Sequence, residues 1–128
     1  MGGEALLALK DRVSFLTTSA QVDEFLAAHP DAAIFKAGTC HKTQETFSHV
    51  QAHLEPHEEL ALGIIRVVEA RPASNRVTEL TGVSHESPQF FLFKGGKAVF
   101  DRDNWDITDE DVAAGLAEHF PGVGATAR

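Results

Sequence analysis

Short apolar segments typical of strands alternate along this chain with segments whose apolar residues have helical spacing. Strands are expected at 13–16, 32–36, 62–68, 89–93 and 98–100, with helices between them, a short helix over 4–10 before them and a last helix from Thr108. Strands joined through a helix run parallel, whereas Gly95-Gly96 predicts a hairpin that adds an antiparallel strand. The order β-α-β-α-β-α-β-β-α therefore predicts an α/β fold with one mixed sheet covered by helices on both faces.

The size and composition of the chain narrow its class. The 128 residues, 43% of them apolar, are expected to form a single domain with a core over 12–120 and a flexible tail over 121–128. No apolar run is long enough for a membrane span, and no secretory signal is evident, so we predict a cytoplasmic protein without a membrane partner. A net charge of −8 argues against nucleic-acid binding, which needs clustered Lys and Arg.

Cys40 is the only cysteine, and it lies at the predicted junction between a strand and a helix. Unpaired backbone N–H groups and the helix dipole favour a thiolate at such a position, and the thiolate is the reactive form. Three residues later, where a Cys-x-x-Cys site has its second thiol, the chain has Thr43. Cys40 is therefore predicted to act as a monothiol nucleophile that an outside thiol must release. An inert, buried cysteine is the alternative.

Several side chains near Cys40 in the sequence could tune it. Lys36 and Lys42 are candidates to stabilise a thiolate and to bind an anionic small thiol, with ordinary surface charge as the alternative for each. A protonated His41 would also favour the thiolate, although an exposed histidine is mostly neutral at pH 7. The hydroxyl of Thr43, one helical turn along, is expected to hydrogen-bond to the sulfur.

Three histidines have the i, i+4, i+8 spacing that could align metal ligands on a helix: His49, His53 and His57. Pro56 interrupts that helix before the third histidine, and the first two lie opposite its apolar side. We therefore interpret them as solvated side chains and predict no metal site. Trp105 is interpreted as a loop-packing residue rather than a stacking platform.

Ser87-Pro88 immediately precedes the strand at 89–93. A proline before this strand, a reactive cysteine and the element order together resemble the thioredoxin-like fold. The resemblance implies a cis Ser87–Pro88 bond, and it implies that Ser87 presents backbone groups to an extended substrate. It also implies that the Cys40 sulfur lies within about 4 Å of the Pro88 ring. His85 and Glu86 either line this cleft or cap its loop.

Four stretches extend the resemblance to a particular family: Val68-Glu69-Ala70-Arg71-Pro72, Ser74-Asn75, His85-Glu86-Ser87-Pro88-Gln89 and Trp105-Asp106-Ile107-Thr108. They resemble the monothiol bacilliredoxins, over about 18–116. That family's active-site motif is Thr-Cys-Pro-Ile-Ser; Thr39 and Cys40 match it, whereas His41, Lys42 and Thr43 depart from it.

The resemblance implies a cytosolic thiol-disulfide oxidoreductase that removes bacillithiol from mixed disulfides on proteins. Its co-substrate would be bacillithiol or another low-molecular-weight thiol, with no tightly bound cofactor. Because bacillithiol carries a malate group, Lys36 and Lys42 are expected carboxylate contacts. The expected site comprises catalytic Cys40 and the substrate-binding residues Lys36, Thr39, His41, Lys42, Thr43, Ser87 and Pro88.

Two other functions remain open on the sequence. The altered motif after Cys40 would suit a thioredoxin-fold adaptor without redox activity. In such an adaptor the pKa of the Cys40 thiol would stay near that of a free cysteine, about 8.5. An iron–sulfur or zinc carrier could instead use Cys40 and a small thiol across a dimer.

Overall fold

The computed structural model describes residues 8–121. Its strands are β1 (Val13–Phe15), β2 (Ala32–Ala37), β3 (Ala61–Arg66), β4 (Gln89–Lys94) and β5 (Lys97–Asp103). Its helices are α1 (Ser19–Ala28), α2 (His41–Leu54), α3 (Arg71–Thr81) and α4 (Asp109–His119), with short 3-10 helices η2 (Leu9–Arg12) and η3 (Asn104–Asp106). The start of the helix expected over 4–10 and nearly all of the expected flexible tail lie outside the described residues.

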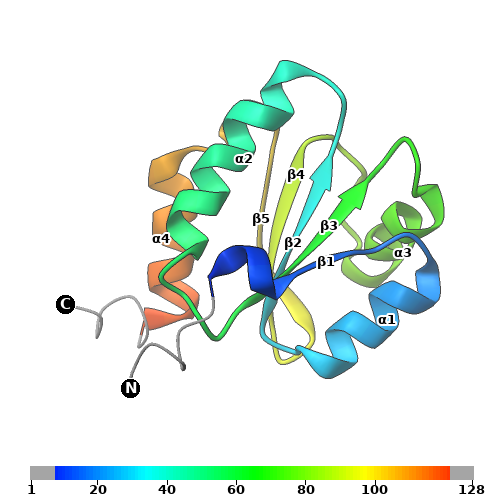
Figure 1. The fold of residues 1–128 in the computed structure, drawn as a ribbon, viewed down its shortest axis with the longest axis horizontal. Coiled ribbons are helices and arrows are strands. Elements are labelled where there is room, and N and C mark those ends of the chain that lie inside the picture. Colours follow the sequence, from blue (N-terminus) through cyan, green and yellow to red (C-terminus); the bar gives the residue numbers. More distant parts are fainter. Residues whose placement is uncertain (1–7, 122–128) are drawn as a thin grey trace.

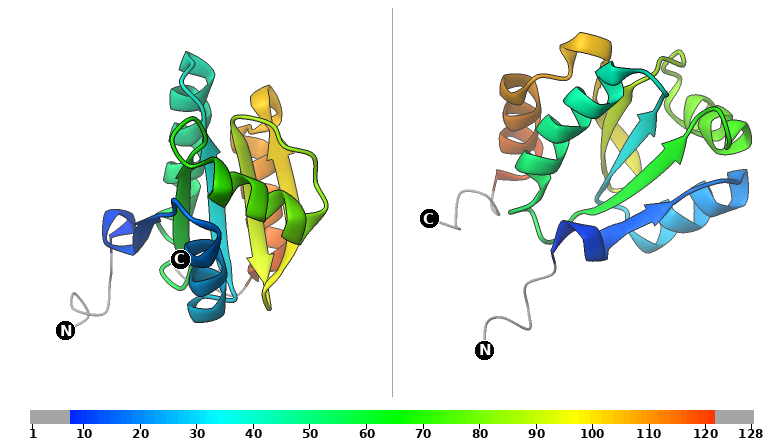
Figure 2. Two further views of the ribbon diagram at one scale, coloured as in Figure 1. Left: turned by 90° about the vertical axis from the view of Figure 1, so that its right-hand side faces the viewer. Right: turned by 45° about the horizontal axis from the view of Figure 1, so that its top comes forward.

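The five strands form one sheet in the order β1-β3-β2-β4-β5, which puts β2 at its centre. The pairs β1–β3 and β3–β2 are parallel, whereas β2–β4 and β4–β5 are antiparallel. α2 and α4 cover one face of the sheet, and α1 and α3 cover the other (Figures 1 and 2). The predicted α/β architecture with a mixed sheet is therefore confirmed.

The central strand β2 supplies side chains to both layers of the core. Phe35 packs in the cluster on the α2/α4 side, and Ile34 packs in the cluster on the α1/α3 side. Side chains alternate along a strand, so Lys36 shares the side of Ile34. Five consecutive residues of β2 are buried, and Lys36 is the last of them. This places a cation inside the α1/α3 layer at the carboxyl end of β2.

Local hydrogen bonds and one glycine define several helix ends. The Thr18 hydroxyl accepts a hydrogen bond from the Gln21 N–H at 3.1 Å, and the Thr108 hydroxyl accepts one from the Asp111 N–H at 3.0 Å. Such caps satisfy donors that have no partner within the helix. Gly82, with a φ of 73°, ends α3 in the left-handed conformation that glycine adopts without strain.

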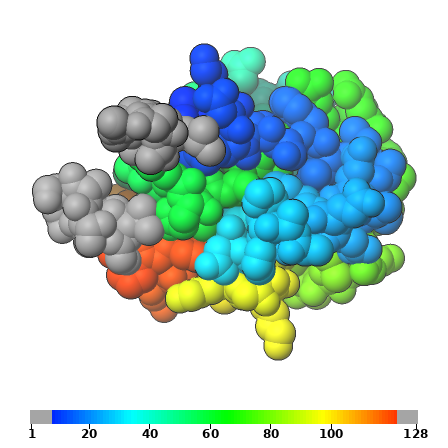
Figure 3. All heavy atoms as spheres, turned by 60° about the horizontal axis from the view of Figure 1, so that its bottom comes forward, coloured from blue at the N-terminus to red at the C-terminus, as the bar shows by residue number. Residues whose placement is uncertain are grey.

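Of the three histidines expected to be solvated, His49 and His53 are partly exposed, whereas His57 is buried. His49 and His53 lie 3.1 and 3.0 Å from the two carboxylate oxygens of Asp109, so they connect α2 to α4. His57 is buried, because Arg12 donates hydrogen bonds to the carbonyls of His57 and Leu60 and so holds the α2–β3 connection against η2. Figure 3 shows the end of the molecule where η2, α1 and the β4–β5 turn share the surface.

Candidate active site

Cys40 lies where the chain passes from the central strand β2 into α2. The connection between these two elements is at the top of the molecule in Figure 1. Cys40 is the N-cap residue of α2, with extended backbone (φ −91°, ψ 167°), and its thiol is free and exposed. The first-turn N–H groups of α2 therefore face a sulfur that solvent and substrates can reach. An inert core cysteine is excluded by this exposure.

The helix start lowers the pKa of the Cys40 thiol. The Thr43 N–H donates to the backbone carbonyl of Cys40 at 3.0 Å, and the structure records no capping hydrogen bond to the Cys40 side chain. As a thiolate the side chain is stabilised first by the backbone N–H of Thr43 and then by the backbone N–H of Lys42. The Thr43 hydroxyl and the Lys42 charge add smaller contributions to the lowered pKa, and partial desolvation opposes them. The backbone of α2 is thus the main cause of thiolate formation.

Thr43 connects the helix start to the loop before it. Its hydroxyl oxygen accepts a hydrogen bond from the Gly38 N–H at 3.0 Å, which leaves the hydroxyl hydrogen for the sulfur of Cys40. Gly38 in turn lies against Ser87, because a Cβ at Gly38 would collide with the Ser87 hydroxyl. Because glycine has no side chain, Gly38 allows the loop before Cys40 and the loop that contains Ser87 to approach closely.

Pro88 lies at the same edge of the sheet as Cys40. Lys36 of β2 pairs with Gln89 of β4, so the residue before β4 lies across from the end of β2. Pro88 is buried, and the Ser87–Pro88 peptide bond is cis. Gln89 braces this loop from inside, since its side-chain amide donates to the Ser84 carbonyl at 3.0 Å. The contact of about 4 Å between the Cys40 sulfur and Pro88 stays a prediction.

Asn104 of η3 connects the two loops, and sequence reasoning did not identify it. Its side-chain carbonyl accepts a hydrogen bond from Lys42 Nζ at 2.9 Å, and its amide group donates to Glu86 at 3.2 Å. Its backbone N–H donates to the Pro88 carbonyl at 2.9 Å. Asn104 has a φ of 52°, a conformation that asparagine tolerates better than most residues. In the sequence, only the tolerance of asparagine for a positive φ could have pointed to this residue.

The position of Lys36 differs from the expectation of a cation beside the thiol. Its side chain is fully buried on the α3 side of the sheet, whereas Cys40 begins the helix on the opposite side. Lys36 Nζ donates to the Thr78 hydroxyl at 3.2 Å and lies 3.3 Å from His85 Nδ1. Burial lowers the pKa of Lys36 from 10.5 to about 8. Direct contact between Lys36 and an anion at the Cys40 sulfur is therefore not supported.

The remaining expected residues surround the thiol with polar and aromatic groups. Thr39 and His41 are exposed on either side of Cys40. The ring of His41 lies 6.1 Å from that of Trp105, whose side chain is half exposed. Within residues 8–121, no group of histidine, cysteine and acidic side chains is arranged to hold a metal ion, and no helix could cross a membrane.

Solved structures with the same fold include thioredoxins. One, described as a candidate oxidoreductase with a thioredoxin fold, is 24% identical; the match covers 88% of this chain and 99% of that one, with a TM-score of 0.74. Thioredoxin O2 from Arabidopsis thaliana is 13% identical over 89% of this chain and 99% of its own, with a TM-score of 0.71. Fasciola hepatica thioredoxin is 16% identical; the match covers 82% of this chain and 97% of that one, with a TM-score of 0.63. These likenesses establish the thioredoxin fold.

A comparison with protein families gives a match to the family described as monothiol bacilliredoxin BrxC. The match covers residues 14–112, from β1 to the first turn of α4, and so includes Cys40, the Ser87–Pro88 loop and Asn104. Both the fold and the exposed cysteine at the start of α2 agree with a thiol redox role. On this evidence the chain belongs to the monothiol bacilliredoxin family.

Proposed function

We propose that this protein removes bacillithiol from mixed disulfides on other proteins, with Cys40 as the nucleophile. The observation that carries the proposal is an exposed, single thiol at the N-terminus of α2, where backbone N–H groups lower its pKa. A lowered pKa raises the thiolate fraction at neutral pH, and only the thiolate attacks a disulfide. Family membership supports the thiol chemistry, and the small-thiol partner is our inference.

The reaction consists of two exchanges. The Cys40 thiolate attacks the bacillithiol sulfur of a protein mixed disulfide, a bond forms between these two sulfurs, and the protein thiolate leaves and takes up a proton. A second bacillithiol then attacks the bound one as a thiolate, so bacillithiol disulfide is released and Cys40 is restored. An outside thiol is needed because Thr43 stands where a second cysteine would resolve the intermediate.

Residues around the thiol receive separate roles in this proposal. Thr43 stabilises the thiolate with its backbone N–H and its hydroxyl. Ser87 and Pro88 offer the backbone edge along which a substrate segment lies, in the manner of β-strand addition. Thr39 and His41, both exposed beside the thiol, contact the bound thiol. Lys42, fixed by Asn104, supplies a positive charge near a carboxylate of the small thiol.

Intact mass tests the first exchange directly. The protein is incubated with a bacillithiolated protein, and its mass is measured without reductant. We expect a single bacillithiol adduct on Cys40, the release of the other protein in its thiol form, and reversal of the adduct by added bacillithiol. Cys40→Ser and Cys40→Ala should form no adduct while keeping the wild-type circular dichroism spectrum, since the thiol is exposed at a helix end.

The same experiment separates the proposal from an adaptor function. An adaptor would show no adduct on Cys40 and a thiol pKa at the ordinary value of a free cysteine. Loss of the folded spectrum in both Cys40 variants would assign the thiol a structural role instead. A coloured or metal-containing preparation after anaerobic reconstitution would favour the carrier function.

A further inference from the structure

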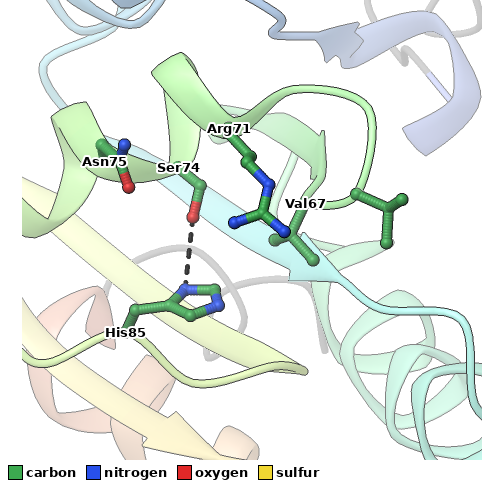
Figure 4. Close-up of a pocket in the computed structure, with 6 residues that line it drawn as sticks. Val67, Arg71, Ser74, Asn75 and His85 are labelled. Atoms are coloured by element: carbon green, nitrogen blue, oxygen red, sulfur yellow. Dashed lines mark hydrogen bonds between the residues drawn. The ribbon is translucent and has the colours of Figure 1, made fainter.

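A small pocket opens beside α3 at the same edge of the sheet as Cys40 (Figure 4). We call it the α3 pocket; it has a volume of about 100 Å³ and is lined by Val67, Val68, Arg71, Ser74, Asn75 and His85. Two contacts connect it to the thiol loop. The Val67 N–H donates to the Ala37 carbonyl at 3.0 Å, and His85 is two residues before Ser87, which packs against Gly38.

Two groups that line the α3 pocket, Arg71 and His85, can donate hydrogen bonds into it. Lys36 Nζ can only donate as an ammonium, and it lies 3.3 Å from His85 Nδ1, so that nitrogen acts as the acceptor. The Ser74 hydroxyl lies 3.2 Å from the same nitrogen. Partial desolvation and then the Lys36 charge lower the pKa of His85, and the Glu86 charge opposes them. With Nδ1 as the acceptor, the neutral ring carries its proton on Nε2. In Figure 4 this second nitrogen turns away from Ser74 toward the opening beneath Arg71.

Arg71 completes the set of donors. Among residues 8–121 its guanidinium makes no hydrogen bond or ion pair, although its charge acts on His85. No acidic residue lines the α3 pocket. The acidic residues next to the lining in the sequence are Glu69 and Glu86; Glu86 accepts a hydrogen bond from Asn104, and its charge acts on His85. With Arg71 and His85 as donors and no acidic side chain in its lining, the α3 pocket suits a group that accepts hydrogen bonds and carries negative charge.

Lys36 gives an independent reason to expect an anion here. It is fully buried, its hydrogen-bond partners are the uncharged groups of Thr78 and His85, and no carboxylate of the described residues pairs with it. A buried cation without a counter-ion costs stability. An anion bound against His85 would supply the missing negative charge one side chain away from Lys36.

We propose that the α3 pocket binds a carboxylate group of the small thiol that Cys40 exchanges. The inference rests on the proposed function, since it names part of the substrate of the same site. The volume of about 100 Å³ is roughly three times the share of one liquid water, which is room for a carboxylate on a short carbon stem. Arg71 would hold the carboxylate through its guanidinium, and His85 would donate from Nε2.

Binding is tested on Cys40→Ser, in which exchange cannot interfere. Succinate is titrated into ¹⁵N-labelled protein at pH 7 and constant ionic strength, with the neutral succinamide as the matched probe. We expect succinate to move the amide signals of Ser74, Asn75 and His85, and succinamide to leave them in place. Equal shifts from both probes, or no shift from succinate, would overturn the proposal, as would binding of inorganic phosphate alone.

Two arginines of α3 provide the matched variants. Arg71→Gln should weaken succinate binding roughly tenfold, which corresponds to about 1.4 kcal/mol. Arg76→Gln should keep the affinity, because Arg76 pairs with Asp23 and Glu79 outside the α3 pocket. Equal affinity of the two variants would overturn the assignment of Arg71.

Exchange kinetics separate this inference from the proposed function. In Arg71→Gln with an intact Cys40, we expect the KM for a dicarboxylate disulfide to rise about tenfold and that for the neutral bis(2-hydroxyethyl) disulfide to stay the same. Equal effects on both disulfides would contradict the α3 pocket as a carboxylate site. If the wild-type protein exchanged with neither disulfide, the proposed function would be wrong. The succinate titration alone would then decide whether the α3 pocket binds a carboxylate.

Discussion

Two lysines lie close to Cys40 in the sequence, and the fold gives them opposite environments. Lys42 is in the first turn of α2, partly exposed, with its ammonium bound to Asn104. Lys36 is fully buried on the other side of the sheet, and burial lowers its pKa to about 8. The comparison shows that distance along the chain does not decide which charge acts on the thiol. Lys42 contributes directly to thiolate formation, whereas Lys36 acts behind His85 at the α3 pocket.

The largest difference between the two lysines should be seen in stability. Between pH 8 and 10.5 the folded Lys36 loses its proton while the unfolded one keeps it, so the free energy of unfolding should rise with pH in this window. The total rise should be on the order of 3 kcal/mol. Lys36→Met should remove the rise and be more stable than wild type at pH 7. Denaturant unfolding at several pH values measures both effects.

Lys42→Met is the matched control for that experiment, since its ammonium is partly exposed. Its unfolding free energy should follow the wild-type pH dependence. If Lys36→Met showed the same pH dependence as wild type, the buried ammonium would not be the cause, and the comparison between the two lysines would fail.

Substitution of Asn104 tests how much its hydrogen bonds to Lys42 and Glu86 contribute to exchange. Asn104→Gly keeps the positive φ but removes the contacts to Lys42 and Glu86, so the exchange rate should fall about threefold, the size of a surface contact. Asn104→Ala removes the same contacts and adds backbone strain, so it should also lose about 1 kcal/mol of stability. Stopped-flow exchange and denaturant unfolding distinguish the two. Wild-type rates in both variants would show that Asn104 does not position the site.

Removing the Lys42 charge should have the smallest effect. Its charge is the last of the contributions that lower the pKa of Cys40, and the ammonium is partly exposed. Lys42→Met should therefore slow exchange with an anionic disulfide by less than about threefold. Lys97→Met, on the hairpin at the opposite end of the sheet, should leave the rate unchanged. A loss of tenfold or more would mean that Lys42 binds substrate more tightly than its exposed position allows.

The sequence predicted the part of the site that local patterns encode. The apolar run of β2, the helical spacing after it and the proline before β4 placed Cys40 at a helix start and Pro88 at the same edge of the sheet. The alternation along β2 also put Lys36 on one side with Ile34. A single strand does not reveal which pair of helices covers that side, so the burial of Lys36 against α3 was not predicted.

Other features depend on segments that meet only in three dimensions. Asn104 joins α2 to the Pro88 loop from a position 62 residues after Lys42, and no pattern in the sequence marks that contact. His57 is buried because Arg12, 45 residues earlier, binds its carbonyl. Both cases rest on hydrogen bonds between irregular segments, whose paths are less constrained by residue pattern than those of strands and helices.

The proposed activation of Cys40 by α2 requires a lowered thiol pKa, and the pH dependence of the alkylation rate of Cys40 measures that pKa. We predict a midpoint below the free-cysteine value of about 8.5, because the backbone N–H of Thr43 is the main stabilising group. Thr43→Val keeps that N–H and removes the hydroxyl, so it should raise the midpoint only part of the way back. A wild-type midpoint at or above the free-cysteine value would show that α2 does not activate the thiol.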